Sequence, residues 1–238
     1  MITLAIDTSD ARGSVFLLTD GAAVSGKPHD DGSDYSGWLL PAVSEILVAA
    51  RVRMEQVDLL AVSTGPGSFT GLRVGLTTVK AWAEVYGKPI IGVCRLEAIA
   101  HSREAKSAFI TASYDAQRGQ LFAAWYRRSA AGIEKAGDER VISPEDFAQQ
   151  VDEEARDAAV SWISLDPQLL QSLETVRRRA KSGDEILPAA SALSATIGKL
   201  AERRAATGQY SDPMSLDANY VRRSDAEIFW KGPPAGVR

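Results

Sequence analysis

The stretch of this sequence that decides the fold is Gly65-Pro66-Gly67-Ser68-Phe69-Thr70-Gly71-Leu72-Arg73-Val74-Gly75. The apolar run 57–63 before it predicts a buried strand, and the apolar spacing after it predicts a helix from Phe69 to Tyr86. A glycine-rich turn at a helix start leaves backbone N–H groups free to hold an anion. The stretch has neither the Gly-Lys-Ser/Thr of a Walker loop nor the spacing of a dinucleotide-binding turn. A turn that needs glycine for its backbone angles is the alternative explanation.

Two faces of the predicted helix differ in character. One is an apolar stripe suited to a core, formed by Phe69, Leu72, Leu76, Val79, Ala83 and Tyr86. The second face carries small side chains at one end and large apolar side chains at the opposite end. It consists of Gly71, Gly75, Thr78, Trp82 and Val85. Small residues let a second helix approach closely, so the sequence favours a contact with another molecule here. The alternative is that a preceding amphipathic helix, expected over residues 38–51, covers this flank within the monomer.

Working outward, strands alternate with helices in the manner of an α/β protein. The first half predicts strands at 2–6 and 14–19, a short third strand, the helix 38–51, the strand 57–63, the helix 69–86 and a strand at 90–94. The second half predicts a hairpin of 108–114 and 120–126, a helix capped by Ser143, a strand at 160–165, and helices over 167–180 and 188–206. The first layout is that of a ribonuclease-H-like half, and the second loosely repeats it. We expect two lobes, residues 1–104 and 105–238, with the last segment packing back on the first lobe.

Composition indicates a globular protein that works in the cytoplasm. The chain has 238 residues, of which 45% are hydrophobic and 24% charged. Its opening residues lack the basic and apolar regions of a signal peptide, and they are too few to span a membrane. The single cysteine, Cys94, excludes an internal disulfide and fits a reducing compartment. The net charge of −4 argues against a free-standing nucleic-acid binder. We expect the arginine clusters 177–179, 203–204 and 222–223 to be solvated helix faces.

Several segments together resemble the TsaB (YeaZ) family. They are Leu4-Ala5-Ile6-Asp7-Thr8-Ser9, Leu39-Leu40-Pro41, the Gly65 to Gly75 stretch, Arg95-Leu96-Glu97-Ala98-Ile99, Asp115-Ala116-Gln117-Arg118 and Asn219-Tyr220-Val221-Arg222. The resemblance implies the actin, sugar-kinase and Hsp70-like fold with two ribonuclease-H-like lobes. It implies partnership with the enzyme TsaD and the ATPase TsaE in making threonylcarbamoyladenosine beside the tRNA anticodon, and a homodimer when TsaD is absent. ATP and metal are then expected in the partner subunits, and tRNA is reached only through the complex.

The same resemblance and the helix pattern together predict the partner-docking surface. It lies on the two helices of the first lobe, and the residues expected in it are Trp38, Leu39, Leu40, Val43, Leu47, Phe69, Thr70, Gly71, Leu72, Val74, Gly75, Thr78 and Trp82.

Two enzyme classes are the alternatives to a non-catalytic subunit. A TsaD-like enzyme holds metal with a His-x-x-x-His pair on a helix, but the corresponding positions here are Arg95 and Ile99, which are not metal ligands. The two histidines, His29 and His101, lie 72 positions apart and have no ligand spacing. We therefore expect no metal, no catalytic residue and no cofactor in this chain.

A sugar-kinase-like phosphotransferase would use the first turn, with Asp7, Thr8 and Ser9 as weak candidates for a vestigial phosphate loop. It would also need a second loop in the later lobe, where the bulky run 162–167 offers few backbone donors. Asp115 and Arg118 could form a catalytic pair, although a turn-capping aspartate and a solvated arginine are the simpler assignment. A plain dimerising protein without a tRNA connection is the third class.

Overall fold

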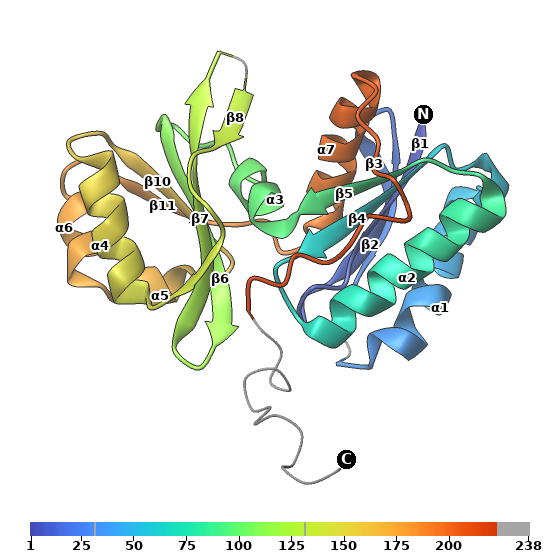
Figure 1. Ribbon diagram of the computed structural model, residues 1–238, viewed down its shortest axis with the longest axis horizontal. Coiled ribbons are helices and arrows are strands. Elements are labelled where there is room, and N and C mark those ends of the chain that lie inside the picture. The colour runs from blue at the N-terminus through green and yellow to red at the C-terminus, as the bar shows by residue number, and fades with distance from the viewer. Residues whose placement is uncertain (31, 131, 223–238) are drawn as a thin grey trace, which may run out of the picture.

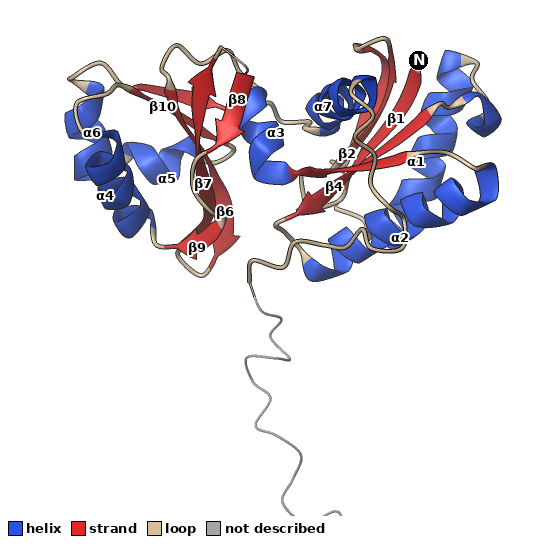
Figure 2. Cartoon of the chain, turned by 45° about the horizontal axis from the view of Figure 1, so that its top comes forward, coloured by secondary structure: helices blue, strands red, loops and turns tan. Residues whose placement is uncertain are grey.

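The computed structural model describes residues 1–30, 32–130 and 132–222, and it shows two α/β lobes side by side (Figure 1, Figure 2). Each lobe is built on one sheet. The strand order is β3-β2-β1-β4-β5 in the first sheet and β11-β10-β6-β7-β8 in the second, where β9 also pairs with β7. Within the described residues, no helix has the length and apolar character that crossing a bilayer requires.

Helices cover both faces of the first sheet. Its strands are β1 (Ile2–Asp7), β2 (Ser14–Thr19), β3 (Ala22–Pro28), β4 (Leu59–Gly65) and β5 (Ile90–Cys94). Helices α1 (Tyr35–Ala50) and α2 (Phe69–Tyr86) pack on one face, with the short 3₁₀ turn η1 (Met54–Gln56) between them in the chain, and α7 (Ser194–Ala206) packs on the other. In β1, Leu4 and Ile6 join the core under α1 and α2, whereas Ala5 faces α7. Burial on both faces explains the continuous apolar run of this strand.

The second sheet carries its helices on the outer face. Its strands are β6 (Phe109–Gln117), β7 (Gln120–Ser129), β8 (Gly132–Lys135), β9 (Arg140–Ile142), β10 (Val160–Ser164) and β11 (Glu185–Pro188). Helices α4 (Pro144–Ala155), α5 (Pro167–Gln171) and α6 (Glu174–Ala180) enclose a core with the side chains of this face. The remaining helix, α3 (Arg95–His101), lies between the two sheets, and its apolar residues belong to one core that both lobes share (Figure 1).

Most elements of the first half match their predicted positions, and the second half differs more. The N-cap of α4 is confirmed, because Ser143 Oγ accepts the Asp146 N–H at 3.1 Å. The helix predicted over 167–180 is two helices, since the buried Leu173 is extended between α5 and α6. The helix predicted from residue 188 begins only at Ser194, after the strand β11. Helix α1 begins at Tyr35, three residues before the predicted start at residue 38, so Pro41 lies in its second turn.

The glycines of the fold-deciding stretch make room for the turn that follows β1. A Cβ atom on Gly67 would overlap the carbonyl oxygen of Ser9, and Cβ atoms on Gly71 and Gly75 would overlap Thr8. The approach is held by hydrogen bonds from Thr8 Oγ1 to Gly71 O at 2.7 Å and from Ser68 N to Ser9 O at 2.6 Å. The small end of the flank, at Gly71 and Gly75, is therefore filled by the chain's own β1 turn, which corrects the expectation for that end. At the other end of the flank Trp82 is half-buried and Val85 is exposed.

This packing predicts a contrast between two glycine-to-alanine changes. Gly75→Ala should lower the free energy of unfolding by about 2 kcal/mol, because the new methyl group overlaps the buried Thr8 side chain. In Gly37→Ala, on α1, no atom lies within 4 Å of the added Cβ, so this change should raise the free energy of unfolding by about 0.5 kcal/mol. Urea unfolding followed by circular dichroism measures both. Equal effects of the two changes would contradict the assigned role of Gly75.

Candidate functional site

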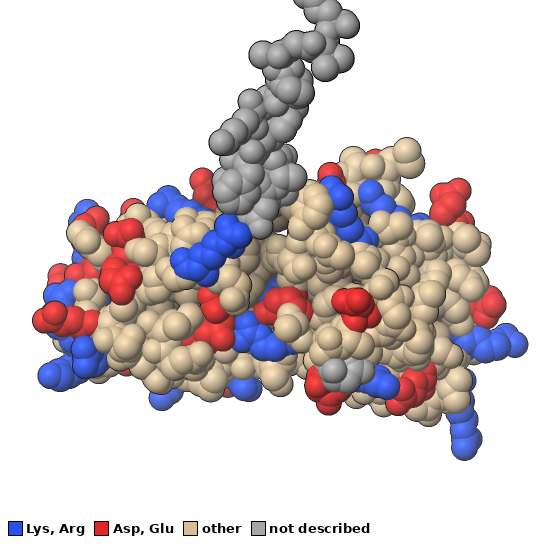
Figure 3. Space-filling model, turned by 90° about the horizontal axis from the view of Figure 1, so that it is seen from below, with Lys and Arg blue, Asp and Glu red and all other residues tan. Residues whose placement is uncertain are grey.

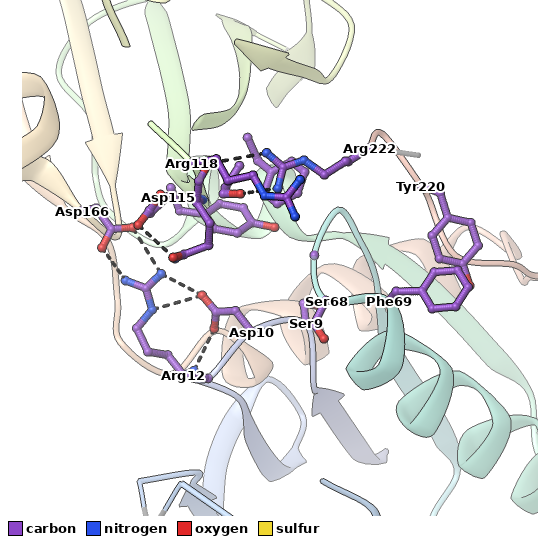
Figure 4. A pocket seen from close by; sticks show the side chains of 16 residues that line it. Ser9, Asp10, Arg12, Ser68, Phe69, Asp115, Arg118, Asp166, Tyr220 and Arg222 are labelled. Carbon is purple, nitrogen blue, oxygen red and sulfur yellow. Dashed lines mark hydrogen bonds and ion pairs between the residues drawn. The ribbon is translucent and has the colours of Figure 1, made fainter. Parts of the chain in front are cut away.

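A cavity of about 570 Å³ lies where the two lobes meet (Figure 4). One wall comes from the turn after β1 and from the N-terminus of α2, which bring Asp10, Arg12 and Ser68. The opposite wall comes from the β6–β7 hairpin and from Asp166, which precedes α5. This volume lies within the usual range of small-molecule sites, so the polar groups around it decide what it can do.

Arg12 forms an ion-pair bridge from the first lobe to the second. Its guanidinium lies 2.7 Å from the Asp10 carboxylate and 2.8 Å from the Asp166 carboxylate, as Figure 4 shows. Asp166 also accepts the backbone N–H of Asp115 at 2.8 Å, which ties it to the end of β6. Acidic and basic groups meet at the junction of the lobes in the space-filling view (Figure 3). The cavity wall is thus built from charges that already neutralise one another.

Below the bridge, the fully buried Arg95 pairs with two carboxylates of the β1 turn. Its Nε lies 3.1 Å from Asp7 Oδ2, and its Nη2 lies 2.6 Å from Asp10 Oδ1. The ring of Tyr114 lies against the guanidinium, with its centroid 4.6 Å from Cζ, and the Tyr114 hydroxyl donates to the Pro66 carbonyl. A buried ion costs several kcal/mol in lost hydration unless it is paired and hydrogen-bonded. Arg95 meets that condition at Nε and Nη2, whereas its buried Nη1 has no hydrogen-bond partner among the described residues.

The electrostatic surroundings favour ionised Asp10 and neutral Tyr114. Burial opposes ionisation of Asp10, but the neighbouring charges of Arg95 and Arg12 outweigh it and hold the pKa of this carboxyl well below its usual range. Burial raises the pKa of Tyr114 well above its ordinary value, although Arg95 acts in the opposite direction. The tyrosine hydroxyl therefore remains a hydrogen-bond donor at neutral pH.

The predicted phosphate-loop residues do not fit a phosphate or a nucleotide. Asp7, Thr8 and Ser9 are buried, and each side chain is engaged inside the protein. Asp7 accepts Ser9 N–H at 3.0 Å on the oxygen that does not face Arg95, and Ser9 Oγ hydrogen-bonds to Ser63 Oγ at 2.7 Å. Thr8 Oγ1 donates to the backbone carbonyl of Gly71 in α2. The three side chains support the turn and do not point to a ligand.

The later lobe lacks a phosphate cradle at the corresponding place. The turn after β10 holds the Asp166 carboxylate, which takes up the donors of Arg12 and of Asp115 N–H. Helix α5 then begins with Pro167, which has no N–H group to offer. A negative side chain and a proline at this position disfavour a bound anion.

The residues at the expected metal-ligand positions do not fit a metal either. Arg95 and Ile99 lie on α3 and are both fully buried. His29 contacts the carbonyl oxygens of Ala11 and Ser33, and His101 Nδ1 lies 3.0 Å from the carbonyl of Glu97 in its own helix. Among the described residues, no group of three or more His, Cys, Asp or Glu is placed to hold an ion.

Asp115 caps the hairpin turn. Its carboxylate accepts the backbone N–H of Gln117 at 2.7 Å and the side-chain amide of the same residue at 3.0 Å. Gln117, Arg118 and Gly119 all have positive φ angles, so the turn needs such a cap. Arg118 lies exposed at the rim of the cavity, beside Arg222 (Figure 4).

Two of the arginines predicted on solvated faces are structural instead. Arg179 is buried and pairs with Asp152 and Asp184, each at 2.9 Å. Arg204 donates to the Gly92 carbonyl at 2.7 Å and pairs with Glu97. Arg222 contacts the β6–β7 hairpin, and Arg223 lies outside the described residues. Most of these acceptors are distant in the chain, although Asp184 lies only five residues after Arg179, so a run of charges does not by itself separate paired arginines from exposed ones.

The residues predicted to dock a partner separate into three groups. Buried in the monomer are Trp38, Leu39, Val43, Gly71, Leu72 and Gly75, and half-buried are Leu47, Val74, Thr78 and Trp82. Exposed are Leu40, Phe69 and Thr70. The buried group contributes to the fold of the first lobe, which corrects the expectation that their side chains face a partner.

Exposed large apolar side chains are confined to one part of the described chain. They are Met1, Val24, Leu40, Val48, Phe69, Val85, Tyr210, Met214 and Tyr220, and all belong to the first lobe or to the segment that follows α7. Leu40 and Val48, on α1, are 55% and 74% exposed. In Figure 3 the half of the molecule that carries α1 and α2 shows a broad, largely uncharged surface.

The lowered pKa of Asp10 predicts an acid-dependent loss of stability. Its ionised form stabilises the fold above the unfolded pKa of about 3.9, and this contribution disappears as pH falls toward the lower folded pKa. Asp10→Asn should therefore cost about 3 kcal/mol at pH 7 and progressively less below pH 4. Urea unfolding of both proteins between pH 7 and pH 2.5 measures the difference. If the difference in free energy of unfolding between the two proteins stays constant over this range, the charge of Asp10 does not contribute to stability.

Comparison with known proteins identifies the family. A sequence model of the family described as TsaD, tRNA N6-adenosine threonylcarbamoyltransferase, matches residues 27–206. The tRNA threonylcarbamoyladenosine biosynthesis protein TsaB of Escherichia coli (strain K12) is 30% identical over 241 residues, which cover 98% of this chain and 99% of that protein. TsaB of Bacillus subtilis (strain 168) is 27% identical over 234 residues, with 97% and 98% covered.

A solved structure agrees with these sequence relatives. YeaZ from Pseudomonas aeruginosa aligns with a TM-score of 0.73 and 25% identity over 92% of this chain and 99% of that one. The two mixed sheets and the structural relatives confirm the predicted actin, sugar-kinase and Hsp70-like fold class. Similarity over nearly the whole length of both sequences shows that the chain belongs to the TsaB (YeaZ) family.

Proposed function

We propose that this chain is a non-catalytic subunit in the biosynthesis of threonylcarbamoyladenosine in tRNA, working in the cytoplasm by binding and supporting TsaD together with TsaE. The observation that carries the non-catalytic part is the closed Asp7–Arg95–Asp10 network. A carboxylate that serves as a metal ligand or a general base must face the substrate. Here Asp7 is fully buried against Arg95, and Asp10, which lines the cavity, is paired with both Arg95 and Arg12.

The supporting role rests on the exposed apolar surface of the first lobe. Leu40 and Val48 on α1, and Phe69 and Val85 on α2, are large and exposed on two helices that pack on the same face of the first sheet. Leu40 and Val48 are eight residues apart and lie on one face of α1, whereas Phe69 and Val85 lie at opposite ends of α2. Exposed apolar residues that share a helix face, as on α1, are typical of a protein–protein interface. We assign it to TsaD, and to a second copy of this chain when TsaD is absent. ATP and metal then bind to the partner subunits, and tRNA contacts this chain only through the complex.

The two enzyme alternatives have less support. A kinase-like reaction needs free hydrogen-bond donors that hold the phosphates of the nucleotide. In the β1 turn and the turn before α5, backbone N–H groups are instead bonded to aspartate carboxylates. A TsaD-like reaction needs metal ligands where α3 carries Arg95 and Ile99. A dimerising protein without a tRNA connection remains distinguishable by experiment, because it would not bind TsaD.

A first prediction addresses the absence of chemistry. The purified chain should bind no stoichiometric divalent metal, show no micromolar Mg-dependent ATP site, and make no threonylcarbamoyladenosine alone. Elemental analysis, calorimetric titration and a tRNA-modification assay with and without TsaD and TsaE measure the three properties. An ATP site of micromolar affinity, worth about −8 kcal/mol, would revive the kinase-like function.

A second prediction addresses docking. Leu40→Asp with Val48→Asp should weaken TsaD binding at least about tenfold and lower tRNA modification by the reconstituted complex, because two carboxylates would be desolvated in an apolar contact. Val24→Asp, 52% exposed on β3, is the matched control and should bind normally. Calorimetry with purified TsaD measures the affinities, and circular dichroism checks folding. Normal binding by the double variant would place the interface elsewhere.

A further inference from the structure

The segment after α7, which we call the strap (residues 207–222), returns across the first lobe toward the second (Figure 1). Ser211 N donates to Ile90 O at 2.9 Å, and Ser211 Oγ accepts the N–H of Gly92 at 3.0 Å. Leu216 packs into the core of the first lobe. These contacts fix the first part of the strap along β5.

The next residues of the strap continue to hold the first lobe. Asn219 N donates to Thr64 O at 2.7 Å, at the end of β4. The Tyr220 ring lies 5.0 Å from that of Phe69, and Tyr220 Oη accepts Arg73 Nε at 3.2 Å. Tyr220 is therefore attached to the first turns of α2, at the edge of the interlobe cavity.

Two residues later the strap contacts the second lobe. Arg222 Nη1 donates to Ala116 O at 2.7 Å, and Nη2 donates to Gln120 Oε1 at 2.6 Å. The guanidinium lies 6.0 Å from the centre of the Phe122 ring. The two acceptors and the aromatic ring all belong to the β6–β7 hairpin. Tyr220 and Arg222 both line the cavity, so residues 219–222 span from one of its walls to the other (Figure 4).

We propose that residues 219–222 form a latch that, beside the Arg12–Asp166 bridge, holds the β6–β7 hairpin to the first lobe across the cavity, and that release of the Arg222 contacts loosens the hairpin and widens the cavity. The apolar core around α3, shared by both sheets, serves as the pivot. The first-lobe end of the strap is fixed by backbone hydrogen bonds and packed side chains, whereas the second-lobe end is held by the hydrogen bonds of the Arg222 side chain and by Val221, which is partly buried against the shared core. The second-lobe end is therefore the one that releases.

Spin labels on the two lobes test the latch. Ser44 on α1 and Ser182 after α6 are exposed, so Ser44→Cys and Ser182→Cys can be labelled in a Cys94→Ser background. In the otherwise unchanged chain the distance distribution between the labels should be narrow. Arg222→Ala should shift it to longer distances and broaden it. Arg203→Ala, which removes an exposed arginine of α7, is the matched control and should leave the distribution unchanged.

Hydrogen exchange supplies a second measurement that does not depend on labels. Amides of the hairpin turn, residues 115–120, should exchange roughly tenfold faster in Arg222→Ala. Gln120→Ala removes one acceptor and should act in the same direction with a smaller effect, which keeps the test available if Arg222→Ala folds poorly. Unchanged label distances together with unchanged exchange in the Arg222 and Gln120 variants would overturn the latch.

Discussion

The pairing of Arg95 with Asp7 and Asp10 is the interaction on which the rest of the structure depends. Arg95 begins α3, Asp7 ends β1, and Asp10 lies in the middle of the turn that follows β1. A fully buried guanidinium is tolerated only with its counter-charges in place, so the pairing fixes the turn against α3. The same turn fills the space left by Gly71 and Gly75 on α2. One buried cation thus sets the relative positions of β1, α2 and α3.

In this arrangement the aspartate and arginine side chains stabilise the structure. Another protein of this fold could use such charged groups for catalysis. Asp10 is shared between Arg95 in the core and Arg12 at the cavity, and Asp166 completes the bridge to the second lobe. Such a network has its ionic groups matched before any ligand arrives. Inserting a phosphate or a metal would require breaking buried ion pairs, which typically costs 3–5 kcal/mol. This cost supports the non-catalytic role that we propose.

The sequence predicted the first lobe well because its periodic patterns are long and mostly local. It could not identify the neighbour of the small flank on α2, since a stripe of glycines shows that something approaches closely but not what approaches. The actual neighbour, Thr8, lies more than sixty residues earlier in the chain. In the second lobe, β8, β9 and β11 have only three or four residues each, too few for a clear alternation.

The charged residues of the site were the least predictable. Arg95 follows an apolar strand, yet nothing near it in sequence reveals that its partners are Asp7 and Asp10. Arg179 and Arg204 were grouped with exposed neighbours for the same reason, because a run of charges normally indicates a solvated face. Tertiary acceptors override that pattern, as Asp152, 27 residues earlier in the chain, does for Arg179. An arginine directly after a buried strand is the one local signal that could have suggested a buried ion pair.

The shared use of Asp10 also means that the core and the junction of the lobes are not independent. Ion pairs that share a partner are coupled, so a shift of Asp166 acts on Arg12 and through Asp10 on Arg95. Arg95 in turn supports the β1 turn, whose Thr8 and Ser9 hold the start of α2. That start carries Phe69, which is part of the exposed apolar surface and also contacts Tyr220 of the strap. The position of the second lobe is therefore physically connected to the surface that we assign to partner binding, although no residue of the second lobe needs to touch the partner.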